Sequence, residues 1–320
     1  MTYIILLNLI VSTVLVPPNS EIHIQQGLNF AYQEKYDSAF YYFNQAVDSN
    51  PQHPSGYFFL AYLCDLYNND LLTTRYQEDF NKYSEITIEL SENLMVRYPA
   101  SGHFYKGAML FSQALNHAYQ GNYLGALRLS TPAYYELGQA IQSDNTLYDA
   151  KLGIGAYKFL KGTLESSLFM NNSLIDEGIA DIQDCAENGN YLNIAAKNLL
   201  ALLLLEKGDK DKSIDYALQL VQQFPRSRTF HWALLKNYVA TGDFPQVINT
   251  GEILVQLIKS GPIVPPGNLA YVYMEMAEAY RETGDVETAK QLCNQILSLP
   301  TDSYTREFKV QAQEFLRKNI

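Results

Sequence analysis

The chain has 320 residues, of which 47% are hydrophobic, and its formal net charge at pH 7 is -11. Because phosphate binding needs a concentrated basic surface, this acidic balance argues against a nucleic-acid partner. The three cysteines, at wide spacing, form neither a disulfide framework nor a CxxC metal motif, and we expect Cys293 to be a buried thiol.

Residues 1–20 contain an apolar run from Tyr3 to Val16, followed by Pro17-Pro18. The run is shorter than the roughly 20 residues that span a bilayer, so we expect no transmembrane span. It suits the apolar core of a secretory signal peptide, although no basic residue precedes it and no small-x-small cleavage site follows. The alternative is an apolar segment packed on the first helix pair. The first interpretation predicts an extracytoplasmic protein, periplasmic or held in the cell envelope, and the second allows a cytoplasmic one.

From residue 21 onward, small, aromatic and turn-forming residues recur at fixed offsets from one another. The first copy comprises Gly27, Phe30, Ala39, Phe43, Ala46 and Pro51. The next two comprise Ala201, Leu204, Gly208, Ser213, Ala217, Leu220 and Pro225, then Leu235, Tyr238, Gly242 and Val247. The last comprises Ala277, Tyr280, Gly284, Ala289, Cys293 and Ile296.

This pattern is typical of paired helices. The small residues occupy positions where two helices approach closely, and the aromatic residues fill the space beside them. Gly-Asp occurs at the same place in three copies, where glycine ends one helix with a positive φ and aspartate starts the next. Pro51 and Pro225 end second helices, because proline cannot continue the intrahelical hydrogen bonds.

The pattern resembles the tetratricopeptide repeat, which implies an all-α solenoid: a right-handed superhelix of antiparallel helix pairs that stack on one another. We expect one superhelical domain over residues 21–320. Its clear repeats span about 20–53, 194–227, 228–261 and 270–303, with irregular helix pairs over 54–193 and a capping helix over 302–318.

The irregular middle departs from the spacing in several ways. We expect a long second helix within 73–98, and a kink or two short helices around Pro132. Gly153 and Gly155 predict a close helix approach, and residues 162–173 a long loop. Residues 100–300 also resemble, through softer motifs, bacterial cell-envelope tetratricopeptide proteins of poorly defined function.

The sequence contains no phosphate loop, HExxH zinc motif or GxSxG nucleophile elbow. The five histidines share no ligand spacing, and carboxylate pairs such as Asp181 with Asp184 and Glu275 with Glu278 are interpreted as solvated surface. We therefore predict no enzyme activity, no catalytic residue, no metal and no cofactor.

The family resemblance implies that the first helix of each pair lines a concave groove. Carried over, it predicts these partner-binding residues: Asn198, Trp232, Lys236, Tyr271, Met274, Glu278 and Arg281. In the first repeat it adds Ile24, Leu28 and Ala31. Aromatic anchors with a few charges are typical of protein or peptide capture.

We therefore expect a non-catalytic scaffold that binds a protein or peptide in its concave groove, in the cell envelope. One alternative is a subunit of an envelope assembly that contacts its partners through the convex face. Another is an enzyme with a site within 145–190, near Tyr157 and Gly162. Peripheral membrane contact through Leu164, Leu168, Phe169 and Met170 is a further, less favoured alternative.

Overall fold

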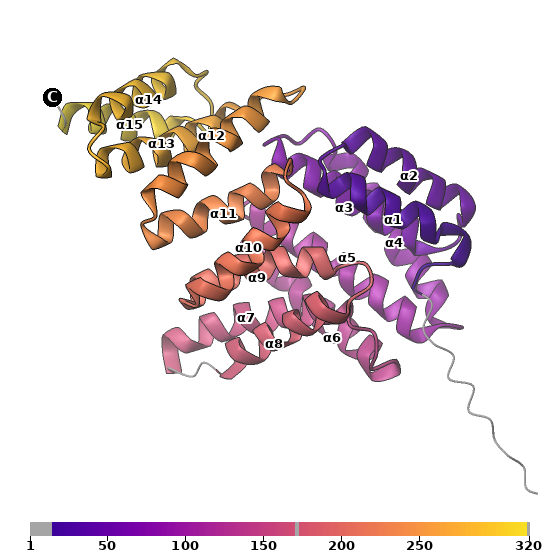
Figure 1. Cartoon of the computed structure of the whole chain (residues 1–320). Coiled ribbons are helices and arrows are strands. Elements are labelled where there is room, and N and C mark those ends of the chain that lie inside the picture. Colours follow the sequence, from indigo (N-terminus) through magenta and orange to yellow (C-terminus); the bar gives the residue numbers. More distant parts are fainter. Residues whose placement is uncertain (1–14, 170–172, 319–320) are drawn as a thin grey trace, which may run out of the picture.

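A computed structural model describes residues 15–169 and 173–318, and over these residues the secondary structure is all helical. The first seven helices are α1 (Pro18–Tyr32), α2 (Tyr36–Ser49), α3 (Pro54–Asp70), α4 (Gln77–Met95), α5 (Pro99–Tyr119), α6 (Tyr123–Ser143) and α7 (Ala150–Phe169). They are followed by α8 (Ser173–Asn188), α9 (Asn193–Lys207), α10 (Lys210–Gln223), α11 (Arg228–Thr241), α12 (Phe244–Ser260), α13 (Pro266–Glu282), α14 (Val286–Ser298) and α15 (Arg306–Lys318). Successive helices pack against each other along the chain (Figure 1). The predicted all-α solenoid is confirmed.

The Gly-Asp turns have the predicted geometry. The φ values of Gly208, Gly242 and Gly284 are 91°, 71° and 92°. Glycine adopts positive φ angles at little energetic cost because it has no Cβ atom. In each case the following aspartate accepts a hydrogen bond from the backbone N–H three residues later and so caps the second helix of the pair.

Two close helix contacts explain why small residues are needed. A Cβ on Gly27 would lie 2.3 Å from the Phe43 ring, and one on Gly155 would lie 2.4 Å from the Gly178 carbonyl oxygen. Because neither position has room for a side chain, the helices α1 and α2, and likewise α7 and α8, approach each other closely.

Two expectations for the middle of the chain differ from the structure. The helix α6 is continuous through Pro132, so two short helices do not form there. Proline removes one helical hydrogen bond, and on this exposed side water can satisfy the freed carbonyl. The helix α7 extends to Phe169 where a loop was expected from residue 162. Gly162 is buried against Ile175, so it is a helix-packing residue and does not start a loop. Met170 and the side chains of Leu168 and Phe169 lie outside the described residues.

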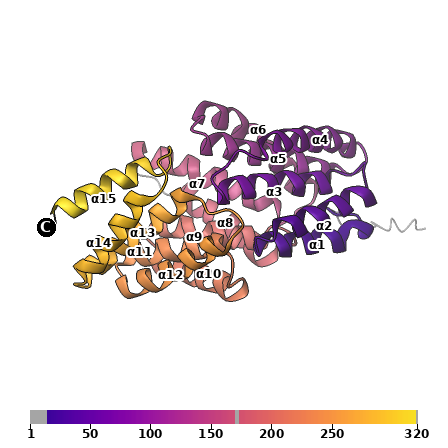
Figure 2. The ribbon, with the colours of Figure 1, turned by 90° about the horizontal axis from the view of Figure 1, so that it is seen from above.

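The solenoid closes on itself, so that its first helices touch elements far along the sequence. The Tyr32 ring lies 5.6 Å from that of Phe224 and 6.0 Å from that of Phe230. The Tyr191 hydroxyl donates to the Glu21 carboxylate at 2.5 Å. One continuous apolar core therefore runs from Leu15 to Phe230, and a second serves the C-terminal helices. Figures 1 and 2 show α9–α11 between the N-terminal and C-terminal ends of the molecule.

This closure corrects one expectation about the groove. Ile24, Leu28 and Ala31 are buried within the first core. The neighbouring Tyr32 is covered by the segment that leads into α11. The inner surface of the first repeat is therefore occupied by the chain itself and is not a free groove.

Two buried charged groups hold the closure in place. The Asp149 carboxylate, 2% exposed, accepts hydrogen bonds from the backbone N–H groups of residues 190–192 and so fixes the turn that carries Tyr191. Arg228, at the start of α11, forms ion pairs with Glu34 after α1 and Asp70 at the end of α3. We call Glu34, Asp70 and Arg228 the Arg228 cluster.

With both carboxyl groups ionised, the Arg228 cluster would carry one more negative than positive charge. The Arg228 Nε lies 2.7 Å from a Glu34 oxygen, and the Tyr36 hydroxyl donates to Asp70 at 2.6 Å. Burial raises the pKa of both carboxyl groups, and the charge of Asp70 raises that of Glu34 further, to about 7. The attraction of Arg228 lowers both pKa values without cancelling the effect of burial.

The apolar N-terminal run falls largely outside the described residues, which begin at Leu15. Leu15 and Val16 are both buried, and the Tyr105 hydroxyl donates a hydrogen bond to the Leu15 carbonyl at 2.7 Å. Within the described ranges no helix has both the length and the apolar character needed to cross a bilayer.

Candidate functional site

Three aromatic side chains form a row on the C-terminal helices. Trp232 on α11, Tyr271 on α13 and Phe308 on α15 are each half-buried. The Trp232 and Tyr271 ring centroids are 5.7 Å apart, and those of Tyr271 and Phe308 are 5.9 Å apart, both edge to face. This geometry fixes the rings against one another and leaves part of each open to a ligand.

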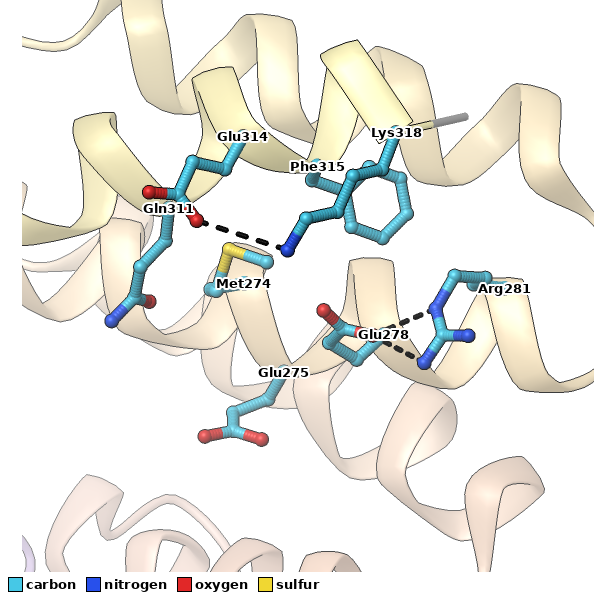
Figure 3. A pocket seen from close by; sticks show the side chains of 8 residues that line it. All are labelled: Met274, Glu275, Glu278, Arg281, Gln311, Glu314, Phe315 and Lys318. Carbon is cyan, nitrogen blue, oxygen red and sulfur yellow. Dashed lines mark hydrogen bonds and ion pairs between the residues drawn. The ribbon is translucent and has the colours of Figure 1, made fainter. Parts of the chain in front are cut away.

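Beside this row, residues of α13 and α15 line a pocket of about 500 Å³ that is open to solvent. Figure 3 shows its lining: Met274, Glu275, Glu278, Arg281, Gln311, Glu314, Phe315 and Lys318. The floor is provided by Met274 and Phe315, which are buried, and the charged side chains stand around it. The pocket therefore combines an apolar base with a polar rim, as small binding sites do.

The carboxylates of the pocket differ in their partners. Glu278 accepts from Arg281 at 2.9 Å, and Glu314 lies 3.9 Å from Lys318. Glu275 instead interacts with the Tyr271 hydroxyl, and no ion pair to a described cation is found for it. Burial raises the pKa of the Glu275 carboxyl, the hydrogen bond with Tyr271 opposes this, and the charge of Glu278 adds to it, so that the pKa lies above its ordinary value.

A partly buried carboxylate without a cation attracts one. A lysine or arginine side chain placed over the Tyr271 ring would meet the face of an aromatic ring and the Glu275 charge together. Three acidic and two basic side chains line the pocket, which leaves one excess negative charge. The arrangement favours a basic ligand group over an acidic one.

The predicted binding residues lie on the helices α9, α11 and α13. Met274, Glu278 and Arg281 line the pocket, and Trp232 and Tyr271 lie in contact beside it. Lys236 is exposed one turn after Trp232 on α11. Asn198 lies on α9, half-buried, and its side-chain oxygen is buried without a hydrogen-bond partner.

The sequence interpretation missed the contribution of α15 and of Glu275. It treated α15 as a cap, yet Gln311, Glu314 and Lys318 form one wall of the pocket. Glu275 was interpreted as solvated surface together with Glu278, but it is half-buried and its pKa is raised. The apolar positions of α15, spaced for a helix that packs on α13, were the available signal.

The region suggested for an enzyme site contains a second cavity, of about 560 Å³, between α6, α7 and α8. Its charged groups are paired: Lys158 lies 2.7 Å from Asp181, and Lys151 contacts Asp184. Burial alone would lower the pKa of Lys158, but Asp181 outweighs it and the pKa is raised. A lysine used as a base or nucleophile needs the opposite shift. Among the described residues, no group of His, Cys, Asp and Glu side chains is arranged to hold a metal ion.

A comparison with protein-family models finds a repeat of paired helices in two segments of the chain. A tetratricopeptide repeat family model matches residues 199–227 and 271–300, which cover most of α9 with α10 and of α13 with α14. No curated protein matches the chain.

Similar solved structures include a tetratricopeptide repeat protein from Parabacteroides merdae, at 15% identity and a TM-score of 0.42, over 95% of this chain and 99% of that one. The C-terminal part of a tetratricopeptide repeat-containing protein from Cytophaga hutchinsonii is 15% identical with a TM-score of 0.48, over 89% and 98%. Yeast Tom70 is 14% identical with a TM-score of 0.42, over 96% and 67%. The two matched segments, together with the antiparallel helix pairs and their Gly-Asp turns, support a tetratricopeptide repeat assignment for this chain.

Proposed function

We propose that the chain is a protein-binding scaffold that captures a partner segment carrying a basic side chain. Tetratricopeptide repeats generally act as non-catalytic binding scaffolds. The observation that supports the finer proposal is the Glu275 carboxylate, half-buried without a cation beside the row of Trp232, Tyr271 and Phe308. Because the inner surface of the first repeat is covered, the groove of α11, α13 and α15 is where we expect the partner to bind.

The test begins with a random linear peptide library panned on the immobilised full chain. We expect the enriched peptides to share a lysine or arginine next to an apolar residue. Replacing Trp232 by alanine should cost about 2 kcal/mol of the binding free energy of such a peptide, the range of an aromatic hot spot. Glu275→Gln should weaken binding by a similar factor, because it removes the charge that pairs with the basic side chain.

Matched controls lie outside the groove. Tyr41 on α2 and Glu89 on α4 are exposed, so Tyr41→Ala and Glu89→Gln should leave peptide affinity unchanged by isothermal titration calorimetry. Enrichment of acidic peptides, or equal losses in the groove and control variants, would contradict the proposal.

The location outside the cytoplasm belongs to the same proposal, and the apolar run before residue 17 supports it. Mass spectrometry of the native protein tests it: a mature N-terminus near Ser20 supports export. Recovery of the chain from Met1 would contradict cleavage and favour the alternative in which Leu15 and Val16 remain packed in the core.

A further inference from the structure

The helix α6 presents an uncovered apolar face to solvent. Tyr123, Leu124, Leu127 and Tyr135 are 73%, 82%, 62% and 62% exposed. These residues lie on one side of the helix, because Tyr123, Leu127 and Tyr135 are spaced by about whole turns of 3.6 residues. Leu124 adjoins them. A contiguous exposed patch of this kind marks an interaction surface. We call Tyr123, Leu124 and Leu127 the α6 knob.

The same side of α6 carries a hollow at its other end. Tyr134, Tyr135, Gly138 and Ile141 line the cavity of about 560 Å³ between α6 and α7. A Cβ placed on Gly138 would meet no atom within 4 Å, so this part of the helix is open. Knob and hollow therefore lie on one helix face, at opposite ends.

The charge around this face identifies what can approach it. The chain has 34 acidic residues, yet none lies between Glu92 and Glu136. In the first half of α6, residues 123–133, the sequence has a single charged residue, Arg128. Asp181, which also lines the hollow, is paired with Lys158. Two copies of a chain with a net charge of -11 can therefore meet here without unpaired carboxylates facing each other.

We propose that the α6 face is the contact of a symmetric homodimer, in which two α6 helices cross in antiparallel orientation. A two-fold axis near Thr131 places Leu124 of each copy over Gly138 of the other, and Leu127 over Tyr135. The knob of one copy thereby enters the hollow of its partner, and the same contact is made twice, as an isologous interface requires. The α5–α6 turn lies at the periphery of the molecule, where a second copy has access (Figure 2).

Sedimentation equilibrium of the purified full chain over a wide concentration range tests the proposal. We expect a mass that rises from 36.3 kDa towards twice that value as concentration increases. Leu124→Glu should weaken the dimer by at least about tenfold, because it buries a carboxylate without a partner. Gly138→Leu should weaken it similarly by filling the hollow, and it cannot do so by unfolding the monomer, since its position is open. Leu218→Glu, at an exposed leucine of α10, is the control and should not change the dimer.

A cysteine at the expected axis gives an independent readout. The three native cysteines are buried, so Thr131→Cys should form an intermolecular disulfide on mild oxidation, while Ser260→Cys, exposed on α12, should remain monomeric. A monomer at every concentration, a dimer that Leu124→Glu and Gly138→Leu leave intact, or equal cross-linking of the two cysteine variants would overturn the proposal. Capture of vesicles by the α6 face in a protein that stays monomeric would overturn it as well.

Discussion

Replacing Arg228 by methionine tests whether the Arg228 cluster holds the two halves of the solenoid together. The arginine side chain is 6% exposed, and its partners Glu34 and Asp70 are 6% and 2% exposed. Methionine has a similar shape but leaves two buried carboxylates without a cation. Removing one partner of a buried pair in this way costs about 3–5 kcal/mol, because the remaining charge is uncompensated.

Urea unfolding at pH 7, followed by tryptophan fluorescence, measures this cost. The single tryptophan, Trp232, lies one helical turn after Arg228 and so reports on the region that the cluster holds. Arg226→Met is the matched control, since Arg226 is exposed two residues away. If the unfolding free energies of the Arg228 and Arg226 variants differ by less than about 0.5 kcal/mol, the size expected of a surface substitution, the cluster does not hold the closure.

The same cluster predicts a pH dependence through Glu34. Its pKa rises from 4.5 to about 7 on folding, so between these values the folded state binds more protons than the unfolded state. The stability that Glu34 provides is therefore complete below pH 4.5 and is lost as the pH rises through 7. This corresponds to about 3 kcal/mol. The difference in unfolding free energy between the native chain and Glu34→Gln should change by an amount of that order between pH 4.5 and pH 8, and a constant difference would refute the assignment.

Further predictions concern single positions. Gly138→Ala should raise the unfolding free energy by about 0.5–1 kcal/mol, because alanine favours the helix and nothing lies near its Cβ; a lower melting temperature would contradict this. Gly27→Ala should instead destabilise by about 1–3 kcal/mol through its clash with Phe43, measured by the same urea titration. Asp149→Ala should leave the amides of residues 190–192 unpaired and speed their hydrogen exchange, whereas unchanged protection would show that another group holds the turn. Because the pKa of Glu275 is raised and a basic peptide stabilises its ionised form, peptide affinity should fall as the pH drops through that pKa, and Glu275→Gln should abolish this dependence.

The parts of the fold that follow from local sequence were predictable. Turns were predicted at Gly208, Gly242 and Gly284, because a left-handed backbone favours glycine. A close helix approach was predicted at Gly27, because no side chain fits there. These signals repeat, so they could be recognised by spacing alone.

The closure of the solenoid and half of the binding groove could not be predicted in this way. Arg228 is separated from Glu34 and Asp70 by 194 and 158 residues, and charged residues at helix ends give no periodic signal that would pair them. Glu275 resembles any surface carboxylate in sequence, and its raised pKa arises only where Tyr271 and Glu278 surround it. Positions that depend on long-range packing had to be read from the structure.

Photo-cross-linking of an enriched basic peptide most directly tests where the partner binds. With a photoreactive group next to its basic residue, the peptide should label residues 228–241, 266–282 and 306–318, which form α11, α13 and α15. Labelling should disappear in the presence of excess unmodified peptide. Specific labelling of α1, whose inner surface the chain itself covers, or of α10 and α12, would contradict the account.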